Sequence, residues 1–363
     1  MPTLEYLRLP NNTVESDPTD IQFEIVEPVI VPKPEDIPGD HIAYNPSSIW
    51  TIPEGQHGAG LDIVYLRVEP DRSNSGTSHL GKSYSRPYII DLNSHRPNLS
   101  PFDGAMTIPG EDPSLTRINR LDSEGNVEEV WLLGVVDAQP YDDQPDRVKS
   151  LKTLFYAGAS LDKLQHVADG PEGMKDIRIG KAGDKTYSTA LHVYGRPQPQ
   201  SFSGNITHRI IPGLEYLNAK TIASAPFIDE ELLKVGSGVW GGVNDVIRVD
   251  DRVNLLPAHR AWRPDDNGRP IVNPNLESKN RHYEAVLYEH DVIENTIREI
   301  GVLATANKFP VGRVKADAAV NLYDVVFTGG GYNGSLEYLT YGVYDGEMAM
   351  SKVVRSIDEE KVA

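Results

Sequence analysis

The sequence predicts an all-β protein that folds as a five-bladed β-propeller. Glycine and proline are frequent, with 31 and 27 copies among 363 residues, and amphipathic helical patterns are scarce. A short pattern also recurs, in which an acid or amide in a turn precedes a strand-forming run. It begins at Asn45 and returns after 67, 64, 69 and 79 residues, at Asp112, Asp176, Asp245 and Asp324. Each step has room for about four short strands, the content of one propeller blade.

These recurring side chains suggest where a site would lie. In a propeller the first strand of each blade lines the central channel, so the five side chains would meet at one mouth. A ring of four carboxylates and one amide suits a polyhydroxylated ligand. Asp and Asn are also common turn formers, so the turns that begin the blades could produce the same series without any function.

The whole chain, residues 1–363, is predicted to be a single propeller domain, because all-β chains of this length often form one domain. Residues 1–40 form an N-terminal extension, in which residues 21–25 alternate apolar and polar side chains as a strand does. This strand could join the last blade and close the ring. Residues 355–363 form a C-terminal tail. The blades are expected to begin near residues 41, 106, 170, 241 and 322.

Alternating or β-branched runs predict the strands of each blade. In the extension and the first two blades they are residues 21–25, 62–69, 83–92, 114–119 and 129–136. In the last three blades they are residues 176–179, 185–194, 205–211, 246–249, 253–257, 282–288, 325–328, 336–341 and 348–354. Polar composition predicts exposed loops at 138–150 and 263–280, and a turn at 183–184. Only 159–166 and 229–234 are candidates for short helices.

Composition excludes several classes of function. The net charge of −18 disfavours nucleic acid and anionic membrane surfaces as partners, because their phosphates would be repelled. The chain has no cysteine, which excludes disulfides and thiolate chemistry. It shows neither a signal peptide nor an apolar run of about 20 residues, so we expect a cytoplasmic protein without a membrane span. No His-Glu-x-x-His or cysteine motif predicts a metal site.

The acids suit chemistry at a glycosidic bond. Cleavage of that bond needs a proton donor for the leaving oxygen, and paired carboxylates are the usual device. Asp112 stands out because Glu111 precedes it and Pro113 follows it, and neighbouring acids could raise its pKa into a useful range. The alternative is an ordinary Asp-Pro turn. A second carboxylate, Asp176 or Asp245, would activate water.

Several cations could face these acids. They are Arg67, Lys175, Arg178, Arg196 and, when protonated, His259. Together they could bind a phosphate, a carboxylate or sugar hydroxyls, or each could form a structural ion pair with an acid at the mouth. Trp50, Trp240 and Trp262 could stack on sugar rings or fill the packing between sheets.

Five segments together resemble a known family. They are residues 170–178 (Gly-Pro-Glu-Gly-Met-Lys-Asp-Ile-Arg), 196–198 (Arg-Pro-Gln), 241–245 (Gly-Gly-Val-Asn-Asp) with Ala258–His259, 281–283 (Arg-His-Tyr) and 324–330 (Asp-Val-Val-Phe-Thr-Gly-Gly). The combination, spread over about residues 45–345, resembles domain-of-unknown-function family 1861. That family is similar to glycoside hydrolase family 130, the β-mannoside phosphorylases and hydrolases of the five-bladed propeller superfamily.

The resemblance implies roles for particular residues. Glu111-Asp112-Pro113 is similar to the segment that holds the proton-donating aspartate, which gives that role to Asp112. His259 is similar to a histidine near the phosphate site, while Ser114 stands where the relatives usually have arginine. The residues expected to bind substrate are Asn45, Arg67, Glu69, Glu172, Lys175, Arg178, Arg196, Asn244, His259 and Asp324, with Asp112, Asp176 and Asp245 as the catalytic acids.

The function expected from the sequence is therefore a glycoside hydrolase acting on a β-mannoside-like glycan without a cofactor, with Asp112 as the acid. Three alternatives stay open. The first is a glycoside phosphorylase that uses inorganic phosphate as co-substrate, which the missing arginine after Pro113 makes the lesser expectation. The second is a carbohydrate-binding propeller without catalysis, and the third is a purely structural propeller. No oligomeric state is predicted.

Overall fold

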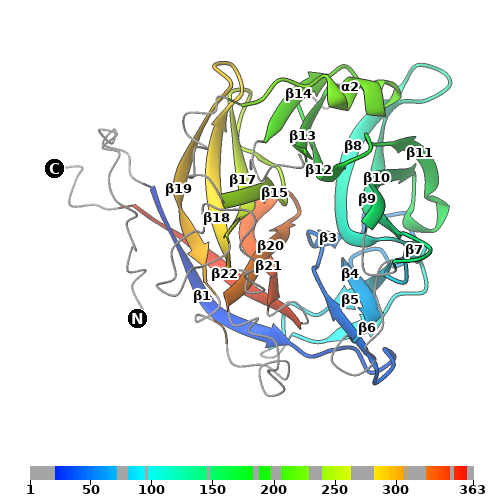
Figure 1. Ribbon diagram of the computed structural model, residues 1–363, viewed down its shortest axis with the longest axis vertical. Coiled ribbons are helices and arrows are strands. Elements are labelled where there is room, and N and C mark those ends of the chain that lie inside the picture. Colours follow the sequence, from blue (N-terminus) through cyan, green and yellow to red (C-terminus); the bar gives the residue numbers. More distant parts are fainter. Residues whose placement is uncertain are drawn as a thin grey trace.

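The computed structural model describes residues 21–71, 81–94, 97–144, 148–182, 188–197, 206–228, 239–262, 282–305, 309, 324–343 and 347–357. Strands make up nearly all of the regular structure, and they form five blades arranged in a ring (Figure 1). The prediction of an all-β, five-bladed propeller is confirmed. No helix in the described part of the chain is long and apolar enough to cross a membrane.

The blades follow one another along the chain. The first contains β2 (His41–Tyr44), β3 (Trp50–Thr51), β4 (Asp62–Pro70), β5 (Tyr84–Ile90), β6 (Leu99–Pro101) and β7 (Ile108–Pro109). The second contains β8 (Glu111–Leu121), β9 (Val127–Pro140), β10 (Val148–Gly158) and β11 (Gln165–Asp169). The third contains β12 (Met174–Lys181), β13 (Leu191–Pro197) and β14 (Thr207–Ile211).

The fourth and fifth blades form one continuous sheet. The fourth contains β15 (Val239–Val243), β16 (Ile247–Arg248), β17 (Val253–Trp262), β18 (His282–Asp291) and β19 (Thr296–Ala304). The fifth contains β20 (Asp324–Tyr332), β21 (Ser335–Val343), β22 (Glu347–Ile357) and β1 (Ile21–Val31). The two blades join where β18 pairs in parallel with the start of β20. The short helices are η1 (Leu161–Lys163), η2 (Leu214–Tyr216) and α2 (Ala219–Ala223).

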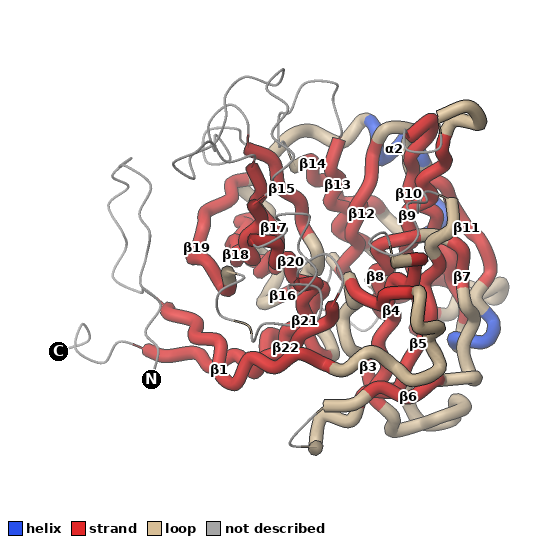
Figure 2. Tube along the Cα trace, turned by 60° about the horizontal axis from the view of Figure 1, so that its bottom comes forward, coloured by secondary structure: helices blue, strands red, loops and turns tan. Residues whose placement is uncertain are grey.

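The N-terminal strand completes the last blade. β1 pairs antiparallel with β22 from Ile21↔Ile357 to Val31↔Met348, so the two ends of the described chain lie side by side (Figure 2). Residues 355–357 thus belong to a strand rather than to a C-terminal tail. The pairing gives β22 a partner that would otherwise be missing at the sheet edge.

Hydrophobic packing lies between neighbouring blades. Each of five buried clusters combines side chains from two adjacent blades. For example, Ile118 of the second blade packs in one cluster with Ile177 of the third, and Ile25 of β1 packs with Leu287 of the fourth. Inner strands such as β4 and β17 are covered on both faces and are buried along most of their length. This packing holds the inner strands in a rigid ring around the channel.

Several strands were missed and one loop is shorter than expected. β2, β6, β7, β10, β11, β15 and β19 were not predicted. The expected exposed loop at 138–150 is confirmed at residues 141–144, whereas residues 138–140 end β9 and residues 148–150 begin β10. These residues are strands because β9 and β10 pair almost up to their ends, which the acidic local sequence does not reveal. The candidate helix at 159–166 contains only η1. The predicted features at 183–184, 229–234 and 263–280 lie outside the described residues.

Candidate functional site

The same backbone irregularity occurs on the channel side of the first three blades. Asn45, Asp112 and Asp176 have φ values of 46°, 51° and 53°, in the left-handed region that Asn and Asp tolerate better than most side chains. At Asp112 and Asp176 the ladder carries a β-bulge, with two residues facing one on the partner strand. The bulge turns the side chain of its first residue towards the channel mouth, which explains the recurring acid or amide.

In the last two blades the positions of the bulges differ from the recurring positions that the sequence predicted. In the fourth blade the backbone N–H groups of Asn244 and Asp245 both donate to Pro257, so Asn244 occupies the position that Asp176 holds in the third. In the fifth blade the register shifts between Thr328 and Gly330, so the equivalent position is Gly329. Assigning Asp245 and Asp324 to this series was therefore wrong. Turns that contain an acid or amide occur at several places in a blade, and only the strand register shows which of them is the bulge position.

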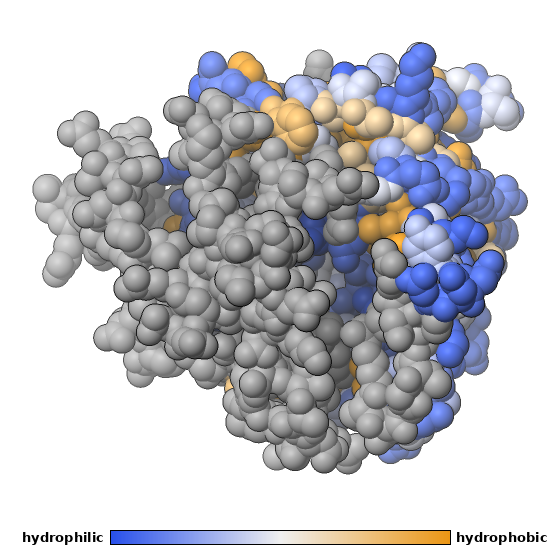
Figure 3. All heavy atoms as spheres, viewed as in Figure 1, coloured by the Kyte–Doolittle hydropathy of each residue, from blue (hydrophilic) through white to orange (hydrophobic). Residues whose placement is uncertain are grey.

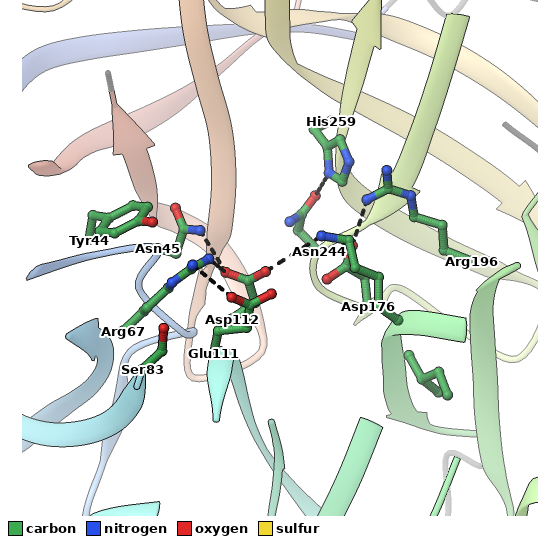
Figure 4. A network of polar contacts seen from close by, with 12 residues as sticks. Tyr44, Asn45, Arg67, Ser83, Glu111, Asp112, Asp176, Arg196, Asn244 and His259 are labelled. Carbon is green, nitrogen blue, oxygen red and sulfur yellow. Dashed lines mark hydrogen bonds and ion pairs between the residues drawn. The ribbon is translucent and has the colours of Figure 1, made fainter. Parts of the chain in front are cut away.

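Arg67 is the centre of the half-site formed by the first two blades. It lies on β4, is 5% exposed, and reaches two acids that begin β8. Its Nη2 is 2.7 Å from Oε2 of Glu111, and its Nη1 is 3.1 Å from Oδ1 of Asp112. The amide of Asn45 donates to the same Asp112 oxygen at 2.6 Å. One guanidinium thus fixes both carboxylates of the Glu-Asp-Pro segment (Figure 4).

Glu69 holds Arg67 in place. Its side chain is fully buried, and it accepts hydrogen bonds from Nε of Arg67 at 2.9 Å, from Tyr44 Oη at 2.7 Å and from Ser83 Oγ at 2.9 Å. The Tyr44 ring also lies against the guanidinium of Arg67, 5.0 Å from its centroid. Glu69 therefore cannot contact a substrate, and its predicted role in binding one is corrected to positioning Arg67.

The two adjacent acids have pKa values that differ in direction. Burial raises the pKa of Glu111 to about 7, with the charge of Asp112 adding to the effect and Arg67 opposing it. The pKa of Asp112 is lowered, because Arg67, Lys175 and the hydrogen bond from Asn45 together outweigh burial. The expectation that neighbouring acids raise the pKa of Asp112 is wrong. Below about pH 7 the pair therefore carries one proton, and Glu111 holds it.

The third blade supplies the cationic half-site. Nη1 of Arg196 donates to Oδ2 of Asp176 at 2.6 Å, and Nη2 of Arg178 is 3.7 Å from Oδ1. Nζ of Lys175 lies between two acids, 3.8 Å from Asp112 and 4.0 Å from Asp176. Three cations around a single carboxylate give this half a surplus of positive charge. They also hold the pKa of Asp176 far below its usual range, in spite of burial.

The cations differ in how accessible they are. The side chain of Lys175 is 23% exposed and that of Arg196 is 10% exposed. Arg178 is directed inwards, because its Nε donates to the carbonyl of Asn244 at 3.0 Å and its Nη1 to that of Ile177. Lys175 and Arg196 can therefore reach an anion at the mouth. Arg178 instead forms an ion pair with Asp176 from the interior side.

The fourth blade contributes a neutral histidine. Nδ1 of His259 donates to Oδ1 of Asn244 at 2.8 Å, and burial lowers the pKa of His259 to about 3. Its Nε2 is then an acceptor, which suits a hydroxyl better than a phosphate oxygen. Gly242 lets Arg196 approach, because a Cβ there would lie 2.9 Å from Cδ of Arg196 and 3.1 Å from Cε1 of His259.

The structure describes the side chains of two further predicted site residues, Asp245 and Glu172. Asp245 is 9% exposed and is held by the fold: its Oδ2 accepts from Ser48 Oγ and from the N–H of Gly331, both at 2.8 Å, and its Oδ1 accepts from its neighbour's N–H. Its predicted role as a catalytic base is therefore not supported. Glu172 lies in an exposed turn. The side chain of Asp324 lies outside the described residues.

The sequence missed three members of the site. Tyr44 and Ser83 support Glu69, and Glu111, which was taken only as a neighbour of Asp112, is the acid with the raised pKa. A signal existed for Glu111, since it adjoins the recurring position in the second blade. None existed for Tyr44 or Ser83, because their role depends on where β4 lies.

The site as a whole is divided by charge. Figure 4 shows Arg67 and the acid pair on one side, and Asp176, Arg196, Asn244 and His259 on the other. Hydrophilic residues are visible in the hollow between the blades (Figure 3). A cavity of about 10 Å³, with room for one water molecule, lies at Ser114, Gly134, Arg178 and Asp245. Among the residues that the structure describes, no group of three His, Asp or Glu side chains could hold a metal ion.

Comparisons with known proteins agree with this fold. The model of the family described as "Protein of unknown function (DUF1861)" matches residues 100–347. Similar solved structures include a mannose phosphorylase from Leishmania mexicana in complex with phosphate ion, with a TM-score of 0.67, 22% identity, and coverage of 91% of this chain and 88% of that one. No curated protein matches.

Two further solved structures share the architecture. A GDP-Man-dependent mannosyltransferase from Leishmania mexicana gives a TM-score of 0.67 at 24% identity, over 92% of this chain and 91% of that one. A hypothetical protein from Leishmania major gives 0.63 at 21%, over 93% and 92%. At such identities the likeness shows a shared five-bladed fold.

Proposed function

This chain belongs to the DUF1861 family, and from that premise we propose that it is a glycoside phosphorylase acting on a β-mannoside-like sugar. The observation that carries the proposal is the division of the mouth by charge. A protonated acid lies on the side of the first two blades, and a surplus of positive charge lies on the side of the third. Phosphorolysis needs both, a proton for the leaving oxygen and a cationic site for the attacking phosphate.

The nucleophile decides between phosphorolysis and hydrolysis. Hydrolysis needs a carboxylate basic enough to take a proton from water. Asp176 is a weak base because three cations surround it, and both oxygens of Asp245 accept hydrogen bonds from the protein. Phosphate is already an anion and needs no base. This argument favours phosphorolysis over the hydrolysis expected from the sequence, although Ser114 replaces the usual arginine.

The proposed reaction is a single displacement. Glu111 gives its proton to the glycosidic oxygen as the bond from that oxygen to C1 breaks, and an oxygen of the phosphate forms the new bond to C1. Ionised Asp112 keeps the proton on Glu111 and accepts a hydrogen bond from a sugar hydroxyl. Lys175 and Arg196 hold the phosphate, and His259 accepts from a hydroxyl. One displacement inverts the anomeric centre, so a β-mannoside would give an α-configured sugar 1-phosphate.

Two of the similar structures support the choice of substrate class. One is described as a mannose phosphorylase with phosphate bound, and the other as a mannosyltransferase that depends on GDP-Man. Both descriptions name mannose, and both proteins span nearly the same length as this chain. We therefore propose mannosides first, with no cofactor other than phosphate as co-substrate.

The test is product analysis with and without inorganic phosphate. Purified protein is incubated with β-linked manno-oligosaccharides, and sugar 1-phosphate and free sugar are measured separately. We expect sugar 1-phosphate only when phosphate is present. Free sugar formed at the same rate without phosphate would identify a hydrolase, and sugar binding without either product would identify a carbohydrate-binding propeller.

A variant of the cationic half-site sharpens this test. Lys175→Met should raise the KM for phosphate about tenfold or more and leave the KM for the sugar nearly unchanged, because a charge-assisted contact is lost. Lys181→Met is the matched control, since Lys181 ends the same strand and pairs with Glu129 away from the site. Equal KM values for phosphate in both variants would remove Lys175 from the phosphate site.

A further inference from the structure

One buried carboxylate of the fourth blade has no part in the proposed reaction and joins three blades. Asp245 is 9% exposed, and its Oδ2 accepts hydrogen bonds from Oγ of Ser48 in the first blade and from the N–H of Gly331 in the fifth, both at 2.8 Å. Its Oδ1 accepts from the N–H of Val246 at 2.8 Å. Because a buried carboxylate without hydrogen bonds is strongly unfavourable, this side chain and its three donors hold one another in place.

The serine belongs to a first-blade segment, residues 45–49, that packs against the backbone of the fifth blade. The N–H of Ile49 donates to the carbonyl of Gly331 at 2.8 Å. Gly330 leaves room for the approach, because a Cβ there would lie 2.1 Å from Oγ of Ser48. The segment is thus fixed to the fifth blade at its end, and the carboxylate of the fourth blade holds its fourth residue.

Asn45, the first residue of this segment, has a backbone conformation that needs such support. Its φ of 46° lies in the left-handed region, which persists only where surrounding contacts hold it. In this conformation its Nδ2 donates to Oδ1 of Asp112 at 2.6 Å, and Nη1 of Arg67 donates to the same oxygen at 3.1 Å. The other oxygen, Oδ2, lies 3.8 Å from Nζ of Lys175. The backbone at Asn45 thus determines which oxygen of Asp112 is presented to the site.

We propose that Asp245 is a positioning residue for the acid pair, which acts through Ser48 to hold Asn45 against Asp112. Loss of the contact between Asp245 and Ser48 would let the left-handed turn at Asn45 relax and would weaken its hydrogen bond to Asp112. The kinetic consequences of this inference rest on the proposed function. Its effect on the ionisation of Asp112 does not depend on any reaction.

The ionisation of Asp112 is a readout that a purely structural role would not change. Burial raises the pKa of Asp112, while Arg67, Lys175 and the hydrogen bond from Asn45 lower it. The charged groups that face Asp112 stay the same when Ser48 is changed, and they are Glu111, Arg67, Lys175 and Asp176. A rise in the pKa of Asp112 would therefore report on the hydrogen bond from Asn45.

The experiment compares two buried serines. Asp245→Asn would leave one of three converging donors without an acceptor and should destabilise the fold, so Ser48→Ala is the decisive variant. Ser351→Ala is the matched control, since Ser351 is 1% exposed and its Oγ donates to Oη of Tyr341 at 3.0 Å within the fifth blade. The pKa of Asp112 is measured from the carboxyl carbon resonances of aspartate-labelled protein, assigned with Asp112→Asn. Turnover of β-linked manno-oligosaccharides with phosphate is measured in parallel.

We expect Ser48→Ala to raise the pKa of Asp112, and Asn45→Ala to raise it at least as far. Ser48→Ala should also lower kcat/KM for the sugar about three- to tenfold, because Asp112 no longer presents one fixed oxygen to it. The KM for phosphate should stay unchanged, since the cations proposed to bind phosphate lie on the third blade. Ser351→Ala should lower the urea midpoint by a similar amount and change neither the pKa nor kcat/KM.

The outcomes separate this inference from the proposed reaction. A pKa of Asp112 that keeps its wild-type value in Ser48→Ala would overturn the positioning role, and so would an equal rise in Ser351→Ala. A raised pKa with unchanged kcat/KM in an active protein would overturn it too. A raised pKa in Ser48→Ala, in a protein that forms no sugar 1-phosphate, would support the positioning role and contradict phosphorolysis.

Discussion

At the scale of single residues, the acid pair and its support divide three tasks among adjacent side chains. Glu111 holds a proton, Asp112 stays ionised, and Arg67 binds both. Glu69 is fully buried and binds Arg67 at Nε and Nη2, which fixes the guanidinium against both acids. Such an arrangement keeps two neighbouring carboxyls in different protonation states, which acid catalysis requires.

The pH dependence of turnover follows from this arrangement. Glu111 must be protonated to act, and its pKa is about 7, so activity should fall as the pH rises through 7. Asp112→Asn should move this fall to lower pH, because the charge of Asp112 raises the pKa of Glu111 and its loss frees Arg67 to lower it. Glu111→Gln should reduce kcat/KM by about 100-fold or more at pH 6.

The measurement is the pH profile of kcat/KM for the wild-type protein and both variants. Glu124→Gln, in an exposed turn of the second blade, is the control and should leave the profile unchanged. A profile in Asp112→Asn that keeps the wild-type midpoint would show that the two acids are not electrostatically linked. Full activity in Glu111→Gln would exclude it as the acid.

At the scale of elements, a buried polar network joins the third and fourth blades. Nδ1 of His192 is 3.0 Å from Nε2 of His208, and Tyr194 Oη is 2.7 Å from Nδ1 of His290. Asn254 donates to Tyr194 at 2.8 Å. All five side chains are at most 5% exposed. The strands that carry them, β13, β14, β17 and β18, are thus linked by hydrogen bonds that need neutral rings.

Acid should weaken this network. Burial lowers the pKa values of His192, His208 and His290 to about 4, 3 and 4, below the value of about 6.5 in an unfolded chain. Between these values the unfolded state binds more protons, so stability should fall as the pH drops from 6.5 towards 4. Each histidine contributes up to about 1.4 kcal/mol per pH unit.

Urea unfolding at several pH values tests this expectation. In His208→Gln the stability at pH 7 should fall, because buried hydrogen bonds are lost, but the slope of stability against pH should become shallower. The control is His166→Gln, since His166 is exposed on the second blade. A slope unchanged in His208→Gln would contradict the role of this histidine in acid sensitivity.

At the scale of the whole molecule, the closure of the ring depends on the N-terminal strand. β1 is the outermost strand of the fifth blade, and its Ile25 packs in a cluster with Ala285, Leu303 and Leu339 of the last two blades. A ring of five blades has no free end once this strand is in place. Stability of the closed ring therefore depends on a segment more than 300 residues distant in sequence from its partner.

Ile25→Ala should test that dependence. Ile25 is 8% exposed, and removing its buried methylenes should cost about 2–4 kcal/mol in the free energy of unfolding. Val26→Ala, at the next position and on the other face of β1, is less buried and should cost clearly less. Urea midpoints measure both. Equal and small losses would show that β1 adds little to the closure.

Much of the fold could be read from the sequence because its signals are local. Strand periodicity, the frequent breakers and the repeat of about 70 residues predict an all-β propeller, and the structure confirms it. Asn45, Asp112 and Asp176 were located because one backbone conformation, the left-handed first residue of a bulge, favours Asn and Asp. At these positions the same side chain suits the left-handed turn and also belongs to the candidate site.

Only the tertiary structure decided what each side chain does. Asp245 and Glu69 were site candidates beside Asp112, but their oxygens accept hydrogen bonds from groups that lie near only after folding, such as Gly331 and Tyr44. The raised pKa of Glu111 arises from burial, which depends on all the blades. Local residue chemistry thus determined the fold class and the ring of candidates. Long-range packing and strand register determined which members are buried, paired or free to react.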